Sequence, residues 1–245
     1  MKKNLLKLGC RPLVLTLFAI TSLSTFASES TIQQFSGVNN VTFNEEQYSN
    51  SFAGNGFLIE HEGKIYAATV KHVLFEAKTP NVTHVWLEDD LKQWQIHPLK
   101  DGGRSIQLGK LINSDKNEKI DGDILKKDWL LFEVEKNNSS LTPLKIRTSP
   151  LREGEKVMAI GCSYAKRETC TQDTYTGNFK SYAEHNLRID LGDTPIEQLR
   201  GLSGSPVVDE NNNLVGIVSN VLPAKGASGL DFAPAKLDYL LSILP

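Results

Sequence analysis

Gly201-Leu202-Ser203-Gly204-Ser205-Pro206 is the stretch that decides the fold, and two β-branched runs follow it at 207–208 and 214–219. The pattern predicts a tight turn that presents one serine, followed by two short strands joined by a polar loop. A nucleophilic serine needs this setting, because its hydroxyl must stand clear of the main chain. Gly201 and Gly204 lack a Cβ atom, so a substrate carbonyl can approach the turn closely. The stretch therefore predicts that Ser203 is a nucleophile.

The pattern around Ser203 also discriminates between families of hydrolases. The nucleophile elbow of α/β-hydrolases needs a glycine two residues after the serine, and Ser205 stands there instead. Gly-x-Ser-Gly-x-Pro followed by a Val-Gly-Ile-Val strand resembles the nucleophile region of chymotrypsin-fold serine proteases, particularly the bacterial trypsin-like peptidases. The plain structural alternative is a Ser-Gly hairpin without chemistry, and partner residues upstream argue against it.

Two upstream residues have the contexts that a serine nucleophile requires, a base and a group that holds the base in one tautomer. His72 follows a strand-like run in a Thr-x-x-His-Val context, similar to the Thr-Ala-Ala-His motif of the family. Asp128 directly precedes an apolar run and resembles the Asp-x-Ala-Leu pattern, whereas Asp121 and Asp123 lie in a loop expected to be solvated. The chain order His72, Asp128, Ser203 is that of chymotrypsin. The resemblance implies a catalytic triad, with the amides of Gly201 and Ser203 as the oxyanion hole.

Substrate preference is less well defined by the sequence. Glu197 lies six residues before Ser203, where the family often places the base of the S1 pocket, and a carboxylate there would favour Lys or Arg. Ser219 and Val221 are the other substrate-binding candidates, and Val221 would narrow the pocket as in elastase-like enzymes. Glutamyl endopeptidases carry a histidine where this chain has Val218, so glutamate preference is not supported. The choice among these preferences stays open.

The first 27 residues read as a signal peptide. Four basic residues precede the apolar run 12–20, and Thr25-Phe26-Ala27 offers small residues for cleavage before Ser28. A retained membrane anchor is the alternative, but the apolar run is short for a span, so no stable anchor is expected after cleavage. This segment predicts an exported protein, either periplasmic or secreted.

Charge and cysteines narrow the classes further. The signal peptide holds four of the 27 basic residues and no acidic one, so 23 basic and 29 acidic residues remain. Such a chain lacks the basic face of a nucleic-acid binder. Cys162 and Cys170 are expected to form a disulfide that closes a hairpin loop, because export means an oxidising compartment. A zinc site at the two cysteines would lack its other ligands. The mechanism that the resemblance implies requires no metal and no organic cofactor, so none is expected.

Many short strand-like runs separated by Gly, Asn, Asp and Ser indicate an all-β protein, and only the C-terminal end looks helical. The family resemblance implies two six-stranded antiparallel β-barrels with the active site between them and a C-terminal helix, without an appended PDZ module. The expected boundaries are an irregular N-terminal extension at 28–50, a first barrel at about 51–136, a second at about 141–233 and a helix at 234–244. The protease domain as a whole would span 51–245.

These observations favour an exported serine endopeptidase that acts on polypeptides through an acyl-enzyme intermediate. Two alternatives are a catalytically silent pseudoprotease that serves as a binding module and an esterase that uses the same triad. The sequence leaves the oligomeric state open. Lys71 replaces a small residue of the family motif beside His72 and is expected to be solvated.

Overall fold

The structure is a computed structural model that describes residues 33–98, 103–169, 172–224 and 229–245. The signal peptide predicted at 1–27 lies outside the described residues, and so does Cys170. Residues 33–245 form one compact unit, and the account below concerns that unit alone.

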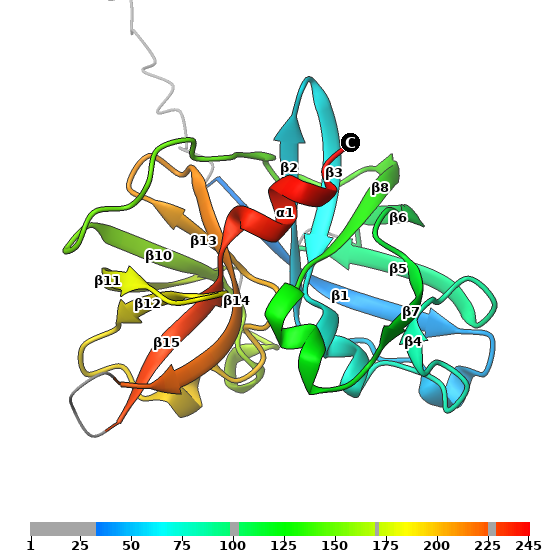
Figure 1. Ribbon diagram of the computed structural model, residues 1–245. Coiled ribbons are helices and arrows are strands. Elements are labelled where there is room, and N and C mark those ends of the chain that lie inside the picture. The colour runs from blue at the N-terminus through cyan, green and yellow to red at the C-terminus, as the bar shows by residue number, and fades with distance from the viewer. Residues whose placement is uncertain (1–32, 99–102, 170–171, 225–228) are drawn as a thin grey trace, which may run out of the picture. The chain divides into compact units, whose positions relative to one another are not determined.

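The first barrel closes six antiparallel strands in the order β1-β5-β6-β8-β3-β2, and β1 pairs back with β2 (Figure 1). Its strands are β1 (Ser36–Phe43), β2 (Asn55–His61), β3 (Lys64–Thr69), β5 (Leu91–His97), β6 (Ile106–Leu111) and β8 (Leu130–Asn137). A short strand β9 (Leu144–Lys145) runs parallel to β2, and β4 (His84–Val85) pairs with β7 (Asp115–Lys119) outside the barrel. Trp94 packs against Phe132 inside the barrel at a ring distance of 5.1 Å, so aromatic side chains fill its centre.

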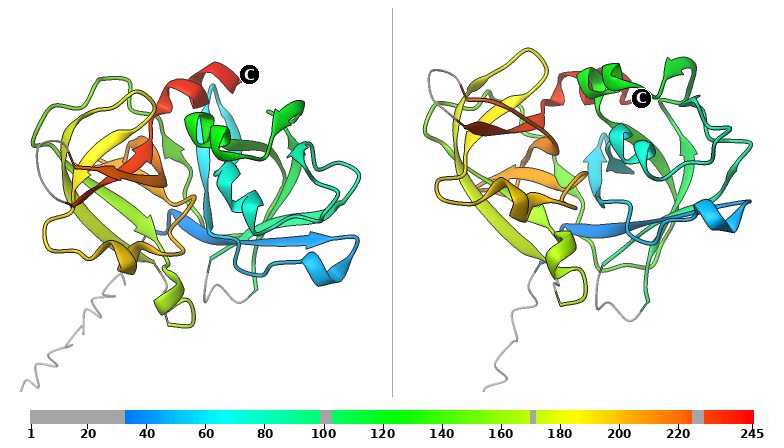
Figure 2. Two further views of the ribbon diagram at one scale, coloured as in Figure 1. Left: turned by 60° about the horizontal axis from the view of Figure 1, so that its bottom comes forward. Right: turned by 90° about the horizontal axis from the view of Figure 1, so that it is seen from below.

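The second barrel closes six strands in the order β10-β11-β12-β15-β14-β13 (Figure 2). These are β10 (Lys156–Gly161), β11 (Asp173–Tyr182), β12 (Leu187–Asp190), β13 (Pro206–Asp209), β14 (Leu214–Pro223) and β15 (Leu230–Ala235). One α-helix follows, α1 (Leu237–Ile243), and short 3₁₀ turns lie in the loops: η1 (Glu46–Tyr48), η2 (Lys71–Phe75), η3 (Gly122–Lys127), η4 (Tyr164–Lys166) and η5 (Ile196–Leu199). The predicted fold class, two six-stranded antiparallel barrels with a C-terminal helix, is confirmed.

The first barrel begins earlier than the sequence suggests. Residues 36–43, expected within an irregular extension, form β1, which pairs with both β2 and β5. Its polar residues hide the strand pattern, because Asn39 is fully buried and bonded rather than exposed. The Asn39 amide donates to the carbonyls of Ala53 and Asn55, and its oxygen accepts from the Trp94 indole. A buried polar group satisfied in this way belongs to the core.

The C-terminal helix begins later than the sequence suggests. β15 continues to Ala235, and Lys236 is the N-cap residue of α1, so Pro234 lies in the strand and not at the helix start. The register between β14 and β15 shifts at this point, from Ala233 opposite Asn220 to Ala235 opposite Ile217. Proline has no amide hydrogen to donate to the ladder, so within sheets it is tolerated at irregularities, where the regular pairing is interrupted.

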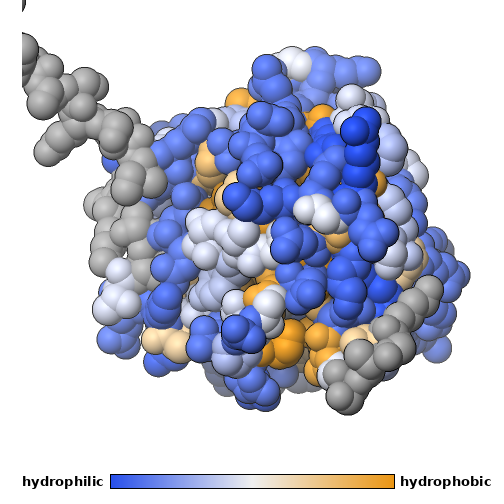
Figure 3. Space-filling model, turned by 90° about the vertical axis from the view of Figure 1, so that its left-hand side faces the viewer, coloured by the Kyte–Doolittle hydropathy of each residue, from blue (hydrophilic) through white to orange (hydrophobic). Residues whose placement is uncertain are grey.

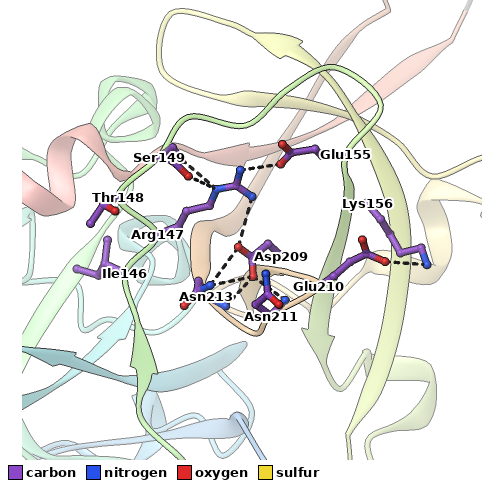
Figure 4. Close-up of a pocket in the computed structure, with 10 residues that line it drawn as sticks. All are labelled: Ile146, Arg147, Thr148, Ser149, Glu155, Lys156, Asp209, Glu210, Asn211 and Asn213. Carbon is purple, nitrogen blue, oxygen red and sulfur yellow. Dashed lines mark hydrogen bonds and ion pairs between the residues drawn. The ribbon is translucent and has the colours of Figure 1, made fainter.

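The segment that joins the two barrels is fastened by Arg147. Its guanidinium contacts Glu155 at 2.8 Å and Asp209 at 3.3 Å and donates to the Ser149 carbonyl (Figure 4). Asp209 also accepts from the Asn213 amide at 2.9 Å. These groups line a polar pocket of about 490 Å³ that includes no residue of the predicted triad. Because the charges are paired with one another, we read this pocket as a structural tie between the linker and the second barrel.

Asp231 ties three strands of the second barrel together and should make stability depend on pH. Its buried carboxylate accepts from Lys180 on β11 at 2.9 Å and from Arg188 on β12 at 2.7 Å. Burial by itself raises the pKa of Asp231, but the hydrogen bonds from Lys180 and Arg188 outweigh it and hold this pKa below its ordinary value of 3.8. A depressed folded-state pKa means that the stabilisation is complete above the ordinary value and is lost as the pH falls through the folded-state value.

We therefore expect the free energy of unfolding to drop below about pH 4 in the wild type and to drop less steeply in Asp231→Asn. Urea unfolding at several pH values between about 2 and 6 measures this. Asp238→Asn is the matched control, because Asp238 is 75% exposed in its pair with Lys236. Equal acid sensitivity in the wild type and Asp231→Asn would contradict the assignment.

Candidate active site

The candidate catalytic residues come from both barrels. His72 lies in η2, which follows β3 after one residue, and Asp128 is the C-cap residue of η3, two residues before β8 begins. Ser203 lies in the turn between η5 and β13 of the second barrel. The structure therefore brings together three segments that lie far apart in the sequence, at a place where both barrels contribute.

The three side chains form a continuous hydrogen-bonded series. His72 Nδ1 lies 2.6 Å from Asp128 Oδ2, and His72 Nε2 lies 2.7 Å from Ser203 Oγ. The main-chain amide of His72 also donates to Asp128 Oδ1 at 2.9 Å, so the carboxylate bonds both the main chain and the imidazole ring of His72. A carboxylate at Nδ1 places the ring proton there, which leaves Nε2 as the acceptor for the serine hydroxyl.

Asp128 is closed off from solvent while His72 stays accessible. The aspartate is 1% exposed, and Ser219 donates from Oγ to its Oδ2 at 2.5 Å. The His72 side chain retains 17% exposure. This difference suits an orienting acid buried behind a base that must reach a substrate.

The turn around Ser203 contains the two main-chain amides, those of Gly201 and Ser203, that are expected to form the oxyanion hole. Gly201 and Gly204 have φ angles of +90° and +81°, and a Cβ atom at Gly201 would lie 2.6 Å from the Tyr164 nitrogen. Within the described part of the chain, the amides of Gly201 and Ser203 have no hydrogen-bond acceptor. Two such donors beside a nucleophile are the arrangement that stabilises an oxyanion.

The three substrate-binding candidates predicted from the sequence lie in different environments. Glu197 is exposed in η5, and an exposed side chain in a surface turn is not the base of an enclosed pocket. The Ser219 hydroxyl donates to Asp128 Oδ2, so it contacts a residue of the predicted triad. Val221 is half-buried in β14 opposite Phe232.

Figure 3 shows the side of the second barrel as mainly hydrophilic, with a small hydrophobic group near the lower edge of the view.

Lys71 is buried, which contradicts the expectation that it is solvated. Its side chain has no exposure, and its Nζ lies 2.7 Å from both carboxylate oxygens of Glu118. The ammonium also donates to Tyr239 Oη at 3.2 Å and lies 4.6 Å from the ring centre. The charge is tolerated because a carboxylate and an aromatic face replace its water. This contact joins η2, which carries His72, to β7 and α1.

Removing the counter-charge of Lys71 should cost much of the stability. Glu118→Gln leaves a buried ammonium without its carboxylate, and we expect the free energy of unfolding to fall by about 3–5 kcal/mol. Chemical denaturation measures the loss. Glu210→Gln breaks a pair with Lys156 in which both side chains are at least half exposed, and it should cost at most about 1 kcal/mol. Similar losses in the two variants would argue against a stabilising role for the buried pair.

Three further features complete the description of the site. Cys162 is 3% exposed, and its predicted disulfide partner Cys170 lies outside the described residues, so this disulfide stays a prediction. In the ranges that the structure covers, no group of three or more His, Cys, Asp or Glu side chains is arranged to hold a metal ion. Among the same residues, none of the helices combines the length and the apolar character that crossing a membrane requires.

The sequence prediction missed the polar residue that contacts the Ser203 turn from the first barrel. Asn55 stands between two glycines at the start of β2, where it looks like a turn residue, yet it is 1% exposed. Its main-chain amide donates to the Ser203 carbonyl at 2.7 Å. Only its place between Gly54 and Gly56, where the backbone of another segment can come close, offered a signal.

Comparisons with known proteins found a family and a solved structure that are similar to this chain. The sequence model of the trypsin-like peptidase domain matches residues 54–217, which include His72, Asp128 and Ser203. A solved structure, the serine endoprotease from Yersinia pestis, is similar with a TM-score of 0.51 at 20% identity. The similarity covers 84% of this chain and 60% of that one, and at this identity it concerns the fold alone. No curated protein matches the sequence.

Proposed function

Because the chain belongs to the trypsin-like peptidase family, we propose that it is a serine endopeptidase that cleaves polypeptides through an acyl-enzyme intermediate. The observation that carries this proposal is the series of contacts from Asp128 through His72 to the Ser203 hydroxyl, at 2.6 and 2.7 Å. Distances in this range are those expected of a nucleophile and its base.

Each step of the proposed reaction uses a group in that series. Ser203 Oγ attacks the scissile carbonyl while His72 Nε2 takes its proton, and Asp128 stabilises the resulting imidazolium. The amides of Gly201 and Ser203 bind the oxyanion, at about 3 kcal/mol for each donor. His72 then protonates the leaving amine as the carbon–nitrogen bond breaks, and a water molecule activated by the same histidine hydrolyses the ester. These steps require no metal and no organic cofactor.

Turnover of an amide compared with its matching ester tests the proposal. Fluorescein-labelled casein and a pair of peptide p-nitroanilide and p-nitrophenyl ester substrates are suitable probes. An endopeptidase should cleave casein and both small substrates, because His72 can protonate an amine leaving group. Hydrolysis of the ester alone would support the triad esterase. No turnover of any probe by the folded protein would support the silent binding module.

We also propose that the protein is exported to the periplasm or secreted. This rests on the basic and apolar pattern of residues 1–27 and the small residues before Ser28. N-terminal sequencing of the protein recovered from the producing cells tests the point. A mature chain that begins at Ser28 would support export, and a chain that keeps residues 1–27 would contradict cleavage.

A further inference from the structure

The orientation of the Gly201 amide depends on the two peptide groups that flank Gly201. The carbonyl of Arg200 accepts from the Tyr164 amide at 2.9 Å. This carbonyl and the Gly201 N–H belong to the same trans peptide, so the N–H points away from Tyr164. The Gly201 carbonyl accepts from the Asn55 side chain at 2.6 Å, which fixes the following peptide. A glycine has wide conformational freedom and no side chain of its own, so bonds to the flanking peptides hold it in place. The Leu202 amide, in the same peptide as the Gly201 carbonyl, also donates to the Leu199 carbonyl at 3.0 Å.

Asn55 uses every part of its side chain to hold this region. Its Nδ2 donates to the carbonyls of Gly201 and Cys162, and its Oδ1 accepts from the Cys162 amide at 3.0 Å. Only a carboxamide offers donors and an acceptor on one planar group. The accepted bond from Cys162 also settles which atom is the oxygen. Asn55 of the first barrel thus bonds both Gly201 and Cys162, the residue after β10 of the second barrel.

Asn55 is itself held firmly. Its carbonyl accepts from Asn39 Nδ2 and Thr69 Oγ1, both at 2.7 Å. A Cβ atom at Gly161, beside the carboxamide, would lie 3.1 Å from Asn55 Oδ1, so the strand β10 packs tightly against it. A buried network whose members are bonded in this way is rigid, so it can hold the loop that it contacts in one conformation.

We propose that Asn55 is a positioning residue of the oxyanion hole, because its side chain fixes the Gly201–Leu202 peptide and thereby aims the Gly201 amide at the developing oxyanion. Asn55 does not touch the reacting atoms, and it acts through Gly201. The role rests on the proposed serine-hydrolase function. It is separate from the triad, since no side-chain atom of Asn55 bonds to His72, Asp128 or Ser203 among the contacts of the described residues.

The test compares the rate of fluorophosphonate labelling with its endpoint. In this reaction Ser203 Oγ bonds to phosphorus, fluoride leaves, and the serine proton passes to His72, so the phosphoryl oxygen needs the same amides. In Asn55→Ser the hydroxyl is too short to reach Gly201. We expect the labelling rate to fall about 100-fold, as for a misplaced catalytic group, while the final labelled fraction stays near that of the wild type.

The readout separates positioning from folding. A merely structural asparagine would give fewer labelled molecules that each react at the wild-type rate, and this result would overturn the proposal. Asn55→Asp is the second variant, because it keeps the volume and the acceptor for Cys162 but turns an oxygen toward the Gly201 carbonyl. It should be slowed at least as much, and a wild-type rate in Asn55→Asp would overturn the proposal even if Asn55→Ser did not fold.

Asn186→Ser is the matched control. Asn186 is also a buried asparagine, but it lies directly before β12 in the second barrel and donates to the Ala233 carbonyl at 2.9 Å, away from Gly201. This variant should label at the wild-type rate whatever stability it loses, and a similar fall in its rate would contradict a specific role of Asn55. Failure of the wild type to label would instead overturn the proposed function, and the role of Asn55 with it.

Discussion

Ser203→Ala is expected to lower kcat for casein cleavage by about 10⁶-fold, the loss typical when a triad nucleophile is removed. Without the hydroxyl 2.7 Å from His72 Nε2, the histidine has no proton to take and no covalent intermediate can form. Binding of the peptide should change little, because the substitution removes only the hydroxyl group. Fluorescence release from labelled casein, followed over hours, measures the residual rate.

Ser205→Ala is the control for that experiment. It makes the same chemical change two residues further on. Within the described ranges, the Ser205 hydroxyl oxygen has no hydrogen-bond partner, so its removal should leave the rate near that of the wild type. Substantial casein cleavage by Ser203→Ala, or its loss only in Ser205→Ala, would show that Ser203 is not the nucleophile.

Asp128→Asn is expected to lower kcat by about 10⁴-fold with the fold intact. The carboxylate accepts the proton on His72 Nδ1 at 2.6 Å, whereas an amide group can turn its NH2 toward that nitrogen. His72 would then carry its proton on Nε2, where it cannot accept from Ser203. Steady-state kinetics on the peptide ester measure the loss, and KM should change far less than kcat.

Asp121→Asn is the matched control for the orienting acid. Asp121 is exposed, and its side chain accepts from the Asp123 amide at the start of η3, a bond that asparagine can also accept. Activity of Asp121→Asn should stay near the wild-type value. If Asp128→Asn kept most of its activity, His72 would have to be oriented by another group.

The candidate triad residues could be selected from the sequence because each lies in a short local pattern. Ser203 lies in a short run that contains Gly201 and Gly204, His72 follows the strand-like run that became β3, and Asp128 precedes the apolar run that became β8. The sequence around each residue therefore carries the information. The strand-like runs indicated an all-β protein, and the family resemblance implied the two six-stranded barrels. The main strands of both barrels, such as β3 and β10, are visible as runs of apolar and β-branched residues.

What the sequence did not reveal depends on contacts across the fold. Asn39, Asn55 and Lys71 are polar residues that look exposed, but each is at most 1% exposed and has partners far away in the chain. No local pattern states that Lys71 will meet Glu118 or that Asn55 will meet Gly201. For the same reason the sequence did not reveal β1, whose buried Asn39 resembles a loop residue. It also offered Glu197 as one candidate for the base of the S1 pocket, although Glu197 is exposed.

The most direct test of the central claim is to locate the fluorophosphonate adduct by peptide mass spectrometry. Digestion after Arg200 releases a peptide that begins at Gly201 and contains both Ser203 and Ser205. We predict one phosphonyl group per molecule, placed on Ser203 by fragmentation and absent when the protein is unfolded before labelling. An adduct on another residue, or no adduct on the folded protein, would contradict the assignment of Ser203 as the activated nucleophile.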